Sequence, residues 1–267
     1  MKASSGFFRC AVAVASAAAL ILTAGCGGSS SSESSSSSSD AVVIGTSNDA
    51  PLAYVGSDGT LTGIDGDIMM AIAKVNGWKV KNSVTGFSTL IESLNTNKID
   101  IINDSMMITD ARKKQAAFSD PFYVLSDAII VKKSETDVTG YDQIKGKAVG
   151  TVTGTIYADF LNTLSSGKVK LFDSQATMIQ AIINGDIYAA VTDQPVAAYS
   201  LKQNSKLDIR VVNPKDPHFQ NKVGPAVRLS DETRLKQLNS GLKKIKANGE
   251  YDKIMKKWDM PASAYLD

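Results

Sequence analysis

The stretches STLIESLNTNKIDIIN (residues 88–103) and TMIQAIINGDIYAAV (residues 177–191) decide the fold, because they repeat one pattern. In each stretch, apolar residues recur at helical spacing, and a short apolar run typical of a buried strand follows. A shift of 88 residues places Leu90 on Met178, Ile91 on Ile179, Leu94 on Ile182 and Ile99 on Ile187. The repeat predicts two similar lobes of the α/β class.

Further patterns predict the elements in and around the repeat. AVVIGTS (residues 41–47) is typical of a strand, and IMMAIAKVNG (residues 68–77) of a helix that ends at Gly77. Ser88 is expected to cap the first helix of the repeat. The second helix is expected to span Thr177 to Asn184 and to stop at Gly185.

Acidic and hydroxyl residues follow each predicted strand of the repeat. Asp104 and Ser105 come after the first strand, and Thr192 and Asp193 after the second. Ligands of open α/β sheets bind beyond the carboxyl ends of the strands, so these residues are expected to face a cleft between the lobes. Asp193 can equally be the N-cap of the helix that Pro195 begins, and the spacing does not separate the two interpretations.

The segment MITDARKKQAAFSD (residues 107–120) carries the clearest chemical signal. Thr109 is a good helix N-cap, yet Arg112, Lys113 and Lys114 follow where the helix dipole disfavours cations. We interpret the two lysines as solvated. A guanidinium beside the free N–H groups of a helix N-terminus forms a receptor for a carboxylate, so Arg112 is predicted to bind one.

The turn in AVGTVTGTIYADFL (residues 148–161) also offers backbone N–H groups and the Thr155 hydroxyl to an anion. By itself such a turn is more often a plain helix cap, and it lacks the spacing and the lysine of a phosphate-binding P-loop. Combined with the other candidates, it predicts a site for a zwitterion. Arg112 and Thr155 would bind the carboxylate, and Asp193 would bind the ammonium group.

Composition excludes several classes of function. Subtracting Lys2 and Arg9, which lie in a segment expected to be removed, from the 29 basic residues leaves 27 against 27 acidic residues. A chain without net charge is a poor candidate for nucleic-acid binding. The cysteines are Cys10 and Cys26 and the single histidine is His218, so a disulfide framework, a cysteine-rich zinc site, a cysteine nucleophile and a Ser/His/Asp triad are all disfavoured.

The N-terminal segment has the order of a secretory signal, with charged residues, an apolar run and small residues before Cys26. LTAGC (residues 22–26) resembles the lipobox of bacterial lipoproteins, which implies a signal peptide over residues 1–25 and a lipid on Cys26. A serine-rich tether would follow over residues 26–40, since SSSSESSSSSS has no apolar side chain to bury. We expect an extracytoplasmic protein anchored to the cell membrane; the alternative is ordinary secretion with an incidental cysteine.

Four ordered motifs resemble those of the bacterial extracellular solute-binding proteins of family 3: GIDGDIMMAIAKVNGWKV (63–80), GFSTLIESLNTNKIDIINDSMMITDARKKQAAFSDPFY (86–123), GKAVGTVTGT (146–155) and NGEYDKIMKKWDM (248–260). The resemblance implies the two-lobed periplasmic-binding-protein-like fold of type II, with two crossover hinge strands. Lobe 1 would be residues 41–127 plus 228–267, lobe 2 residues 132–221, and the hinge residues 128–131 and 222–227.

The resemblance also implies a set of ligand contacts. Arg112 matches the carboxylate-binding arginine of the family, and Asp193 matches its ammonium-binding aspartate. The other matched contacts are the loop at Thr155 and Ile156, the backbone of Ser105 and Met107, and Phe87 beside the ligand side chain. For Phe87, the alternative is a buried core residue.

Two departures from the family pattern concern specificity. Met107 stands where the family usually has a threonine hydroxyl, and Asp49 stands near the place of a stacking aromatic residue. Asp49 and Asp104 therefore add negative charge to the predicted pocket, or else they are solvated loop caps. If they face the ligand, they favour a polar or basic amino acid over glutamate or aspartate; if they turn outward, a small or polar neutral amino acid fits.

We therefore predict a monomeric binding protein without catalysis, cofactor or metal, which delivers an amino acid to the permease of an ABC transporter. One alternative is an enzyme on the same scaffold, similar to dehydratases of cyclic acids, for which His218 is a poor general acid or base. The other is a sensor that presents its ligand-bound form to a membrane receptor, and its pocket residues would be the same.

Overall fold

The computed structural model describes residues 41–266. The predicted signal peptide (1–25), the predicted lipid on Cys26 and the tether (26–40) lie outside the described residues. Within the described residues, none of the helices has the length and apolar character needed to cross a membrane.

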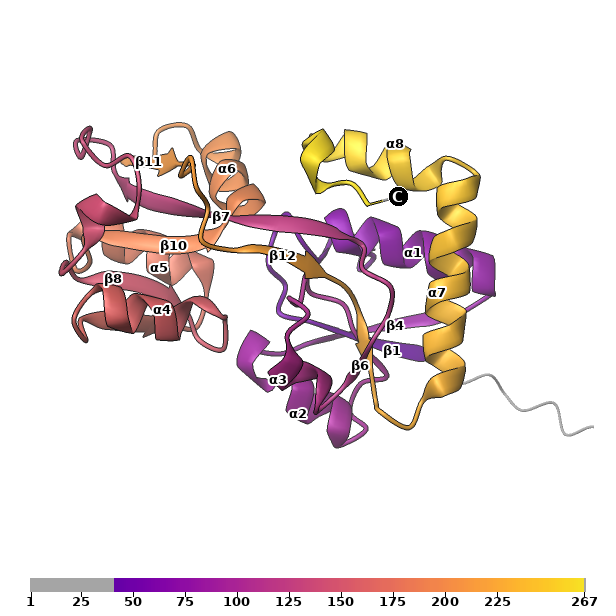
Figure 1. Cartoon of the computed structure of the whole chain (residues 1–267). Helices are drawn as coiled ribbons and strands as arrows, with labels where there is room; N and C mark the ends of the chain where they lie inside the picture. Colours follow the sequence, from indigo (N-terminus) through magenta and orange to yellow (C-terminus); the bar gives the residue numbers. More distant parts are fainter. Residues whose placement is uncertain (1–40, 267) are drawn as a thin grey trace, which may run out of the picture. The chain divides into compact units, whose positions relative to one another are not determined.

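The first sheet has five strands, in the order β4 (Val80–Val84), β1 (Val42–Thr46), β5 (Ile101–Ile102), β13 (Ala226–Val227) and β6 (Ala117–Phe118). β1 runs parallel to β4 and to β5, whereas β13 is antiparallel to β5 and to β6. The surrounding helices are α1 (Ile64–Asn76), α2 (Leu90–Asn95), α7 (Glu232–Ala247) and α8 (Glu250–Lys257) (Figure 1). A small ribbon of β2 (Tyr54–Val55) and β3 (Leu61–Thr62) precedes α1.

The second sheet follows the order β9 (Val169–Phe172), β8 (Val149–Val152), β10 (Ala189–Asp193), β7 (Tyr123–Lys132) and β11 (Ile209–Val212). β8 is parallel to β9 and β10, and β7 is antiparallel to β10 and β11. Its helices are α4 (Tyr157–Leu164), α5 (Gln175–Asn184) and α6 (Gln194–Gln203). The remaining short elements are α3 (Asp110–Lys113), η1 (Phe87–Thr89), η2 (Tyr141–Ile144) and η3 (Ala262–Ala264).

Both sheets follow one plan. In each, the second strand in the order is parallel to both of its neighbours, the fourth strand is antiparallel to the third, and the fifth strand lies at the edge. The order β4-β1-β5-β13-β6 therefore matches the order β9-β8-β10-β7-β11. This equivalence confirms the α/β, two-lobed fold that the repeat predicted.

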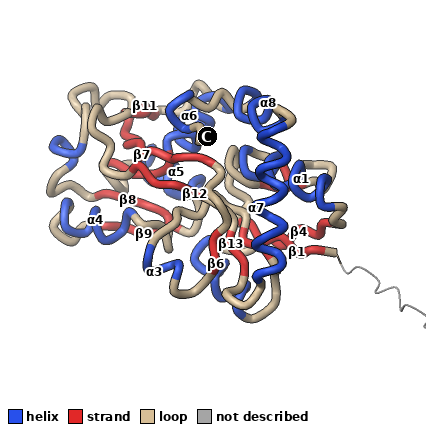
Figure 2. Tube along the Cα trace, turned by 45° about the vertical axis from the view of Figure 1, so that its right-hand side comes forward, coloured by secondary structure: helices blue, strands red, loops and turns tan. Residues whose placement is uncertain are grey.

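Two extended segments join the sheets (Figure 2). β7 pairs with β10 over residues 127–131 and with β12 (Gln220–Val223) over residues 123–126. β12 leads after two residues into β13 of the first sheet. The chain thus passes between the lobes on two adjacent crossover strands, whereas the lobe and hinge boundaries given above remain predictions.

The helix ends show where local signals succeed and fail. Gly77 and Gly185 both cap their helices in the left-handed conformation, as predicted. The prediction that Ser88 caps α2 is wrong, because residues 87–89 form a 3₁₀ turn and Thr89 occupies the N-cap position without a side-chain bond. The predicted start of α5 at Thr177 is also wrong: Ser174 caps this helix by accepting a hydrogen bond from the Thr177 N–H.

Helices α1 and α7 pack closely at Gly241. A Cβ atom at this position would lie 2.7 Å from Cγ2 of Ile72, a buried residue of α1. Real Cβ atoms do not approach that closely, so the glycine allows the two helices to make this contact.

We expect Gly241→Val to lower the free energy of unfolding in urea by about 1–3 kcal/mol, because the added side chain overpacks the α1–α7 contact. Ser240→Val is the matched control, since Ser240 is the exposed neighbour on α7 and should change stability by less than about 0.5 kcal/mol. Equal effects of the two substitutions would contradict this account of the contact.

Candidate ligand-binding site

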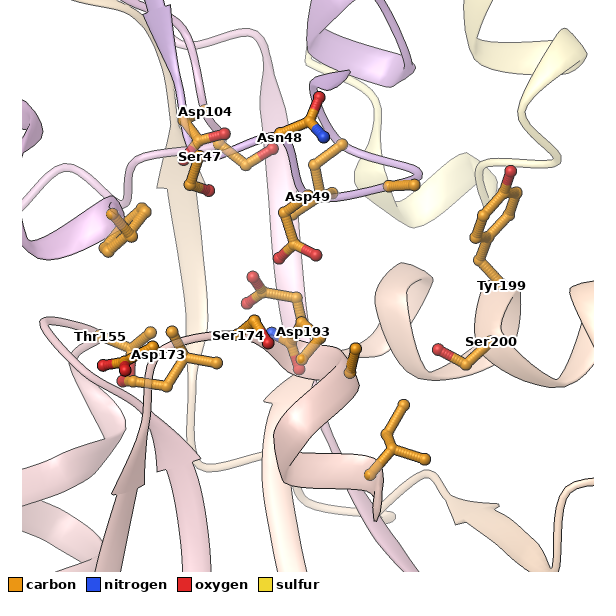
Figure 3. A pocket seen from close by; sticks show the side chains of 18 of the residues that line it. Ser47, Asn48, Asp49, Asp104, Thr155, Asp173, Ser174, Asp193, Tyr199 and Ser200 are labelled. Atoms are coloured by element: carbon orange, nitrogen blue, oxygen red, sulfur yellow. The ribbon is translucent and has the colours of Figure 1, made fainter. Parts of the chain in front are cut away.

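A pocket of about 530 Å³ is lined by residues of both lobes. All nine pocket residues predicted from the sequence line it: Asp49, Phe87, Asp104, Ser105, Met107, Arg112, Thr155, Ile156 and Asp193. Figure 3 shows several of them around the cavity. The structure thus brings the candidates together, while their individual roles toward a ligand remain predictions.

Arg112 is held at the pocket wall by backbone oxygens. Thr109 caps α3 by accepting a hydrogen bond from the Arg112 N–H, which fixes the start of this short helix. The guanidinium donates to the Met107 carbonyl at 2.8 Å and to the Gly154 carbonyl of the other lobe at 3.0 Å. Within residues 41–266, no carboxylate forms an ion pair with it, although Arg112 is only 8% exposed. Its charge is therefore available to an anionic group in the pocket.

Phe87 lies beside this cation. The Cζ atom of Arg112 is 5.4 Å from the centroid of the Phe87 ring, within the range of a cation–π contact. The ring is half-buried: it lines the pocket and also packs against a hydrophobic core cluster, so it is not a core residue alone.

Asp193 ends β10 and occupies the N-cap position of α6, but its side chain makes no capping hydrogen bond. Instead, its Oδ1 accepts a hydrogen bond from the Tyr157 hydroxyl. Burial raises the pKa of Asp193 to about 6, and the Tyr157 hydroxyl and the Arg112 charge limit that rise. The carboxylate therefore belongs to the pocket and not to the helix cap.

Asp49 and Asp104 bring two more carboxyl groups to the same cavity. In Figure 3 the carboxyl group of Asp49 faces that of Asp193. Burial, reinforced by the charges of Asp104 and Asp193, raises the pKa of Asp49 to about 8. Asp104 is 3% exposed and accepts a hydrogen bond from the Thr46 hydroxyl, and burial raises its pKa to about 7. Asp104 is therefore not the solvated loop cap that the sequence allowed, and Asp49 is half-buried at the pocket wall.

The second-lobe loop carries Thr155 and Ile156 before α4 begins. Ile156 occupies the N-cap position of α4 without a side-chain bond, so the turn is not a side-chain helix cap. The Thr155 hydroxyl donates to the Val152 carbonyl at 2.8 Å. To donate to a ligand carboxylate, as predicted, this hydroxyl has to rotate away from Val152.

Sequence reasoning missed several polar residues of the pocket, among them Tyr157, Gln175 and Tyr199. Tyr157 donates a hydrogen bond to Asp193, whereas Gln175 and Tyr199 line the pocket walls at α5 and α6. Of these, only Tyr157 had a local sequence signal for a place in the pocket, because it directly follows the Thr155–Ile156 loop. Gln175 and Tyr199 reach the pocket only because α5 and α6 pack against the second sheet.

Two further observations bear on chemistry. The ring of His218 stacks on Phe160 with centroids 3.8 Å apart, and His218 does not line the pocket. In the part of the chain that the structure describes, no group of three or more His, Cys, Asp or Glu side chains is placed to hold a metal ion. The pocket thus combines one fixed guanidinium with the carboxyl groups of Asp49, Asp104 and Asp193 and, at an exposed position, that of Asp173, an arrangement suited to binding a zwitterion.

The fold and the pocket define a two-lobed binding protein for small solutes. A solved structure of an ancestral arginine-binding protein bound to arginine has this fold, with a TM-score of 0.75 and 34% identity, over 82% of this chain and 97% of that one. The family model of bacterial extracellular solute-binding proteins, family 3, matches residues 42–261. The chain belongs to this family.

Two curated relatives extend the comparison. The arginine-binding periplasmic protein of Mannheimia haemolytica is 34% identical over 212 residues, which cover 78% of this chain and 86% of that protein. The probable histidine-binding protein of Neisseria gonorrhoeae is 32% identical over 216 residues, covering 78% and 79%. These relatives are amino-acid-binding proteins, which confirms the prediction of an extracytoplasmic binding protein and not an enzyme.

The carboxyl cluster predicts how stability depends on pH. Because the pKa values of Asp49, Asp104 and Asp193 are raised above those of an unfolded chain, the folded protein binds more protons. The stability of the ligand-free protein should therefore fall as pH rises from about 5 to about 8. Thermal melting should show a smaller fall for Asp104→Asn than for the parent.

The matched control is Asp186→Asn, because Asp186 is exposed and lies outside the pocket. Its melting temperature should follow that of the parent across the same pH range. A parent protein whose stability rises through this range would contradict the assignment of raised pKa values to the cluster.

Proposed function

We propose that this protein captures an α-amino acid with a basic or polar side chain between its lobes and delivers it to the permease of an ABC importer. In this proposal, Arg112 and the Thr155–Ile156 loop bind the α-carboxylate. Asp193 binds the α-ammonium group, and Phe87 packs against the aliphatic part of the side chain.

The observation that carries the choice of ligand is the balance of charge in the pocket. One guanidinium, that of Arg112, lies in a cavity with the carboxyl groups of Asp49, Asp104 and Asp193, and the exposed Asp173 also lines it. A neutral zwitterion balances the pair of Arg112 and Asp193 alone. The carboxyl groups of Asp49 and Asp104 are costly to ionise in a poorly hydrated site unless a cation meets them, and arginine, lysine, ornithine or histidine supplies one.

The names of the two curated relatives, an arginine-binding and a probable histidine-binding protein, support this ligand class. A neutral polar amino acid is the second candidate. The raised pKa values of Asp49 and Asp104 favour this candidate, because protonated carboxyl groups donate hydrogen bonds to a neutral side chain.

Calorimetry with a series of amino acids tests the proposal. We expect arginine, lysine, ornithine or histidine to bind at least about tenfold more tightly than glutamine, and glutamate to bind most weakly because the carboxylates of the pocket repel it. Binding of a basic amino acid should release protons near neutral pH, since the ligand cation lowers the raised pKa values of Asp49 and Asp104. Calorimetry in buffers of different ionisation enthalpy measures this release.

Two variants separate the parts of the site. Arg112→Ala should cost every amino acid several kcal/mol, on the order of 3 kcal/mol, because the α-carboxylate loses its charged partner. Asp104→Asn should weaken basic ligands and leave glutamine nearly unchanged, and Asp186→Asn should affect neither. Tighter binding of glutamate than of arginine, or unaltered binding by Arg112→Ala, would overturn the proposal.

We also propose that a lipid on Cys26 anchors the protein at the outer face of the cell membrane, with residues 26–40 as a tether. The sequence LTAGC and the serine-rich stretch support this anchor. Cys26→Ser should abolish incorporation of labelled fatty acid and move the protein from the membrane fraction to the medium or the periplasm. A Cys26→Ser protein that stays in the membrane fraction would refute the anchor, and Cys10→Ser is the control that should change nothing.

A further inference from the structure

Asp65, in the GIDGDI motif (residues 63–68), is a buried acid that the binding site described above does not use. It lies in the first turn of α1, is 1% exposed and does not line the pocket. Its Oδ2 accepts two hydrogen bonds from a single residue, one from the Ser105 N–H and one from the Ser105 hydroxyl at 3.0 Å. A buried carboxylate thus holds one residue of the pocket by both its backbone and its side chain.

Ser105 needs such support because of its backbone conformation. Its φ of 47° lies in the left-handed region, which costs residues other than glycine roughly 1–2 kcal/mol. The turn it makes lies between Asp104, whose carboxyl group lines the pocket, and Met107, whose carbonyl accepts from the Arg112 guanidinium. The conformation of Ser105 therefore sets where both groups of the pocket wall lie.

The same loop is tied to the two crossover strands. The Ser105 hydroxyl also lies 2.7 Å from the hydroxyl of Tyr123, a fully buried residue that begins β7. The Ile108 N–H donates to the Lys222 carbonyl of β12 at 2.9 Å. Residues 104–107, the pocket loop, are thus held by α1 on one side and by β7 and β12 on the other, since Met107 itself forms a β-bridge with Val223 of β12.

We propose that Asp65 is a positioning residue for ligand binding: it holds Ser105 in the left-handed conformation and thereby fixes the pocket loop toward the ligand. The inference rests on the proposed function in so far as the pocket loop contacts an amino acid. A carboxylate suits the role because its hydrogen bonds are stronger than those of a neutral acceptor, and because the N-terminal end of α1 favours a negative charge.

The same motif supplies a matched control. Asp67 lies in the same first turn of α1, but it accepts hydrogen bonds from Thr62, Lys257 and Trp258 and none from the pocket loop. Removing either acid perturbs α1, whereas only removal of Asp65 should release Ser105.

The test is a double-mutant cycle of Asp65→Ala and Ser105→Gly, with L-arginine as the probe in calorimetry. Asp65→Ala should weaken arginine binding about tenfold or more, and Asp65→Asn should weaken it less, because the amide oxygen still accepts. In the Ser105→Gly background the loss should shrink to about threefold, because glycine adopts a positive φ without strain. Asp67→Ala should leave the affinity unchanged.

A loss that is equal in both backgrounds would overturn the proposal, as would a loss of the same size in Asp67→Ala. If Asp65→Ala does not fold, Ser105→Ala and Ser105→Gly decide. Both remove the hydroxyl, but only alanine keeps the strain, so Ser105→Gly should bind arginine several-fold more tightly than Ser105→Ala. Equal affinities of these two variants would contradict the role of the backbone conformation.

A readout without ligand separates this inference from the proposed function. Exchange of the Ser105 amide proton, followed by NMR, should be at least about tenfold faster in Asp65→Ala than in Asp67→Ala, because Asp65 is the acceptor of that N–H. If arginine fails to bind the parent, the proposed ligand is wrong, and this exchange rate still tests the link between Asp65 and Ser105. Unchanged exchange would overturn that link.

Discussion

The pocket depends on the way the Arg112 guanidinium is held. Two backbone carbonyls, Met107 from one lobe and Gly154 from the other, accept its hydrogen bonds, and no carboxylate in the described residues pairs with it. Neutral acceptors fix the position of the cation without cancelling its charge. Because the guanidinium has five N–H donors, it retains the capacity to bind an anion, and its two carbonyl contacts connect the walls of the two lobes.

The carboxyl groups opposite Arg112 explain why the pocket should favour a cationic ligand. Burial raises the pKa values of Asp49, Asp104 and Asp193 to about 8, 7 and 6, so at pH 7 in the empty pocket Asp49 is mostly protonated, Asp104 about half protonated and Asp193 mostly ionised. A cationic ligand lowers these pKa values and favours the ionised forms. In the proposed function, selectivity and proton release therefore have one physical origin, the cost of several carboxylates that share a poorly hydrated space.

The sequence predicted much of this arrangement, for reasons that particular residues show. Buried apolar positions such as Leu94 and Ile182 recur at the same spacing in the two halves of the repeat, and this spacing predicted two sheets of the same topology. Arg112 stood out because three successive cations oppose the helix dipole. Gln175 and Tyr199 could not be found in this way, since their place in the pocket depends on how α5 and α6 pack. Ser88 was misassigned because a 3₁₀ turn precedes α2 and shifts its start.

The shared topology of the sheets also explains why carboxyl groups outnumber cationic side chains in the pocket. β5 and β10 are equivalent strands, and an aspartate lies at or just beyond the carboxyl end of each, Asp104 in one lobe and Asp193 in the other. Because the two lobes turn these ends toward one cavity, the repeat itself supplies a carboxyl group from each side. Arg112 has no such counterpart, since α3 follows only the first of these strands and α6 follows the second directly. In the proposed function, the α-carboxylate therefore has one cationic side chain to bind, on the first lobe, and this asymmetry would set the orientation of the bound amino acid.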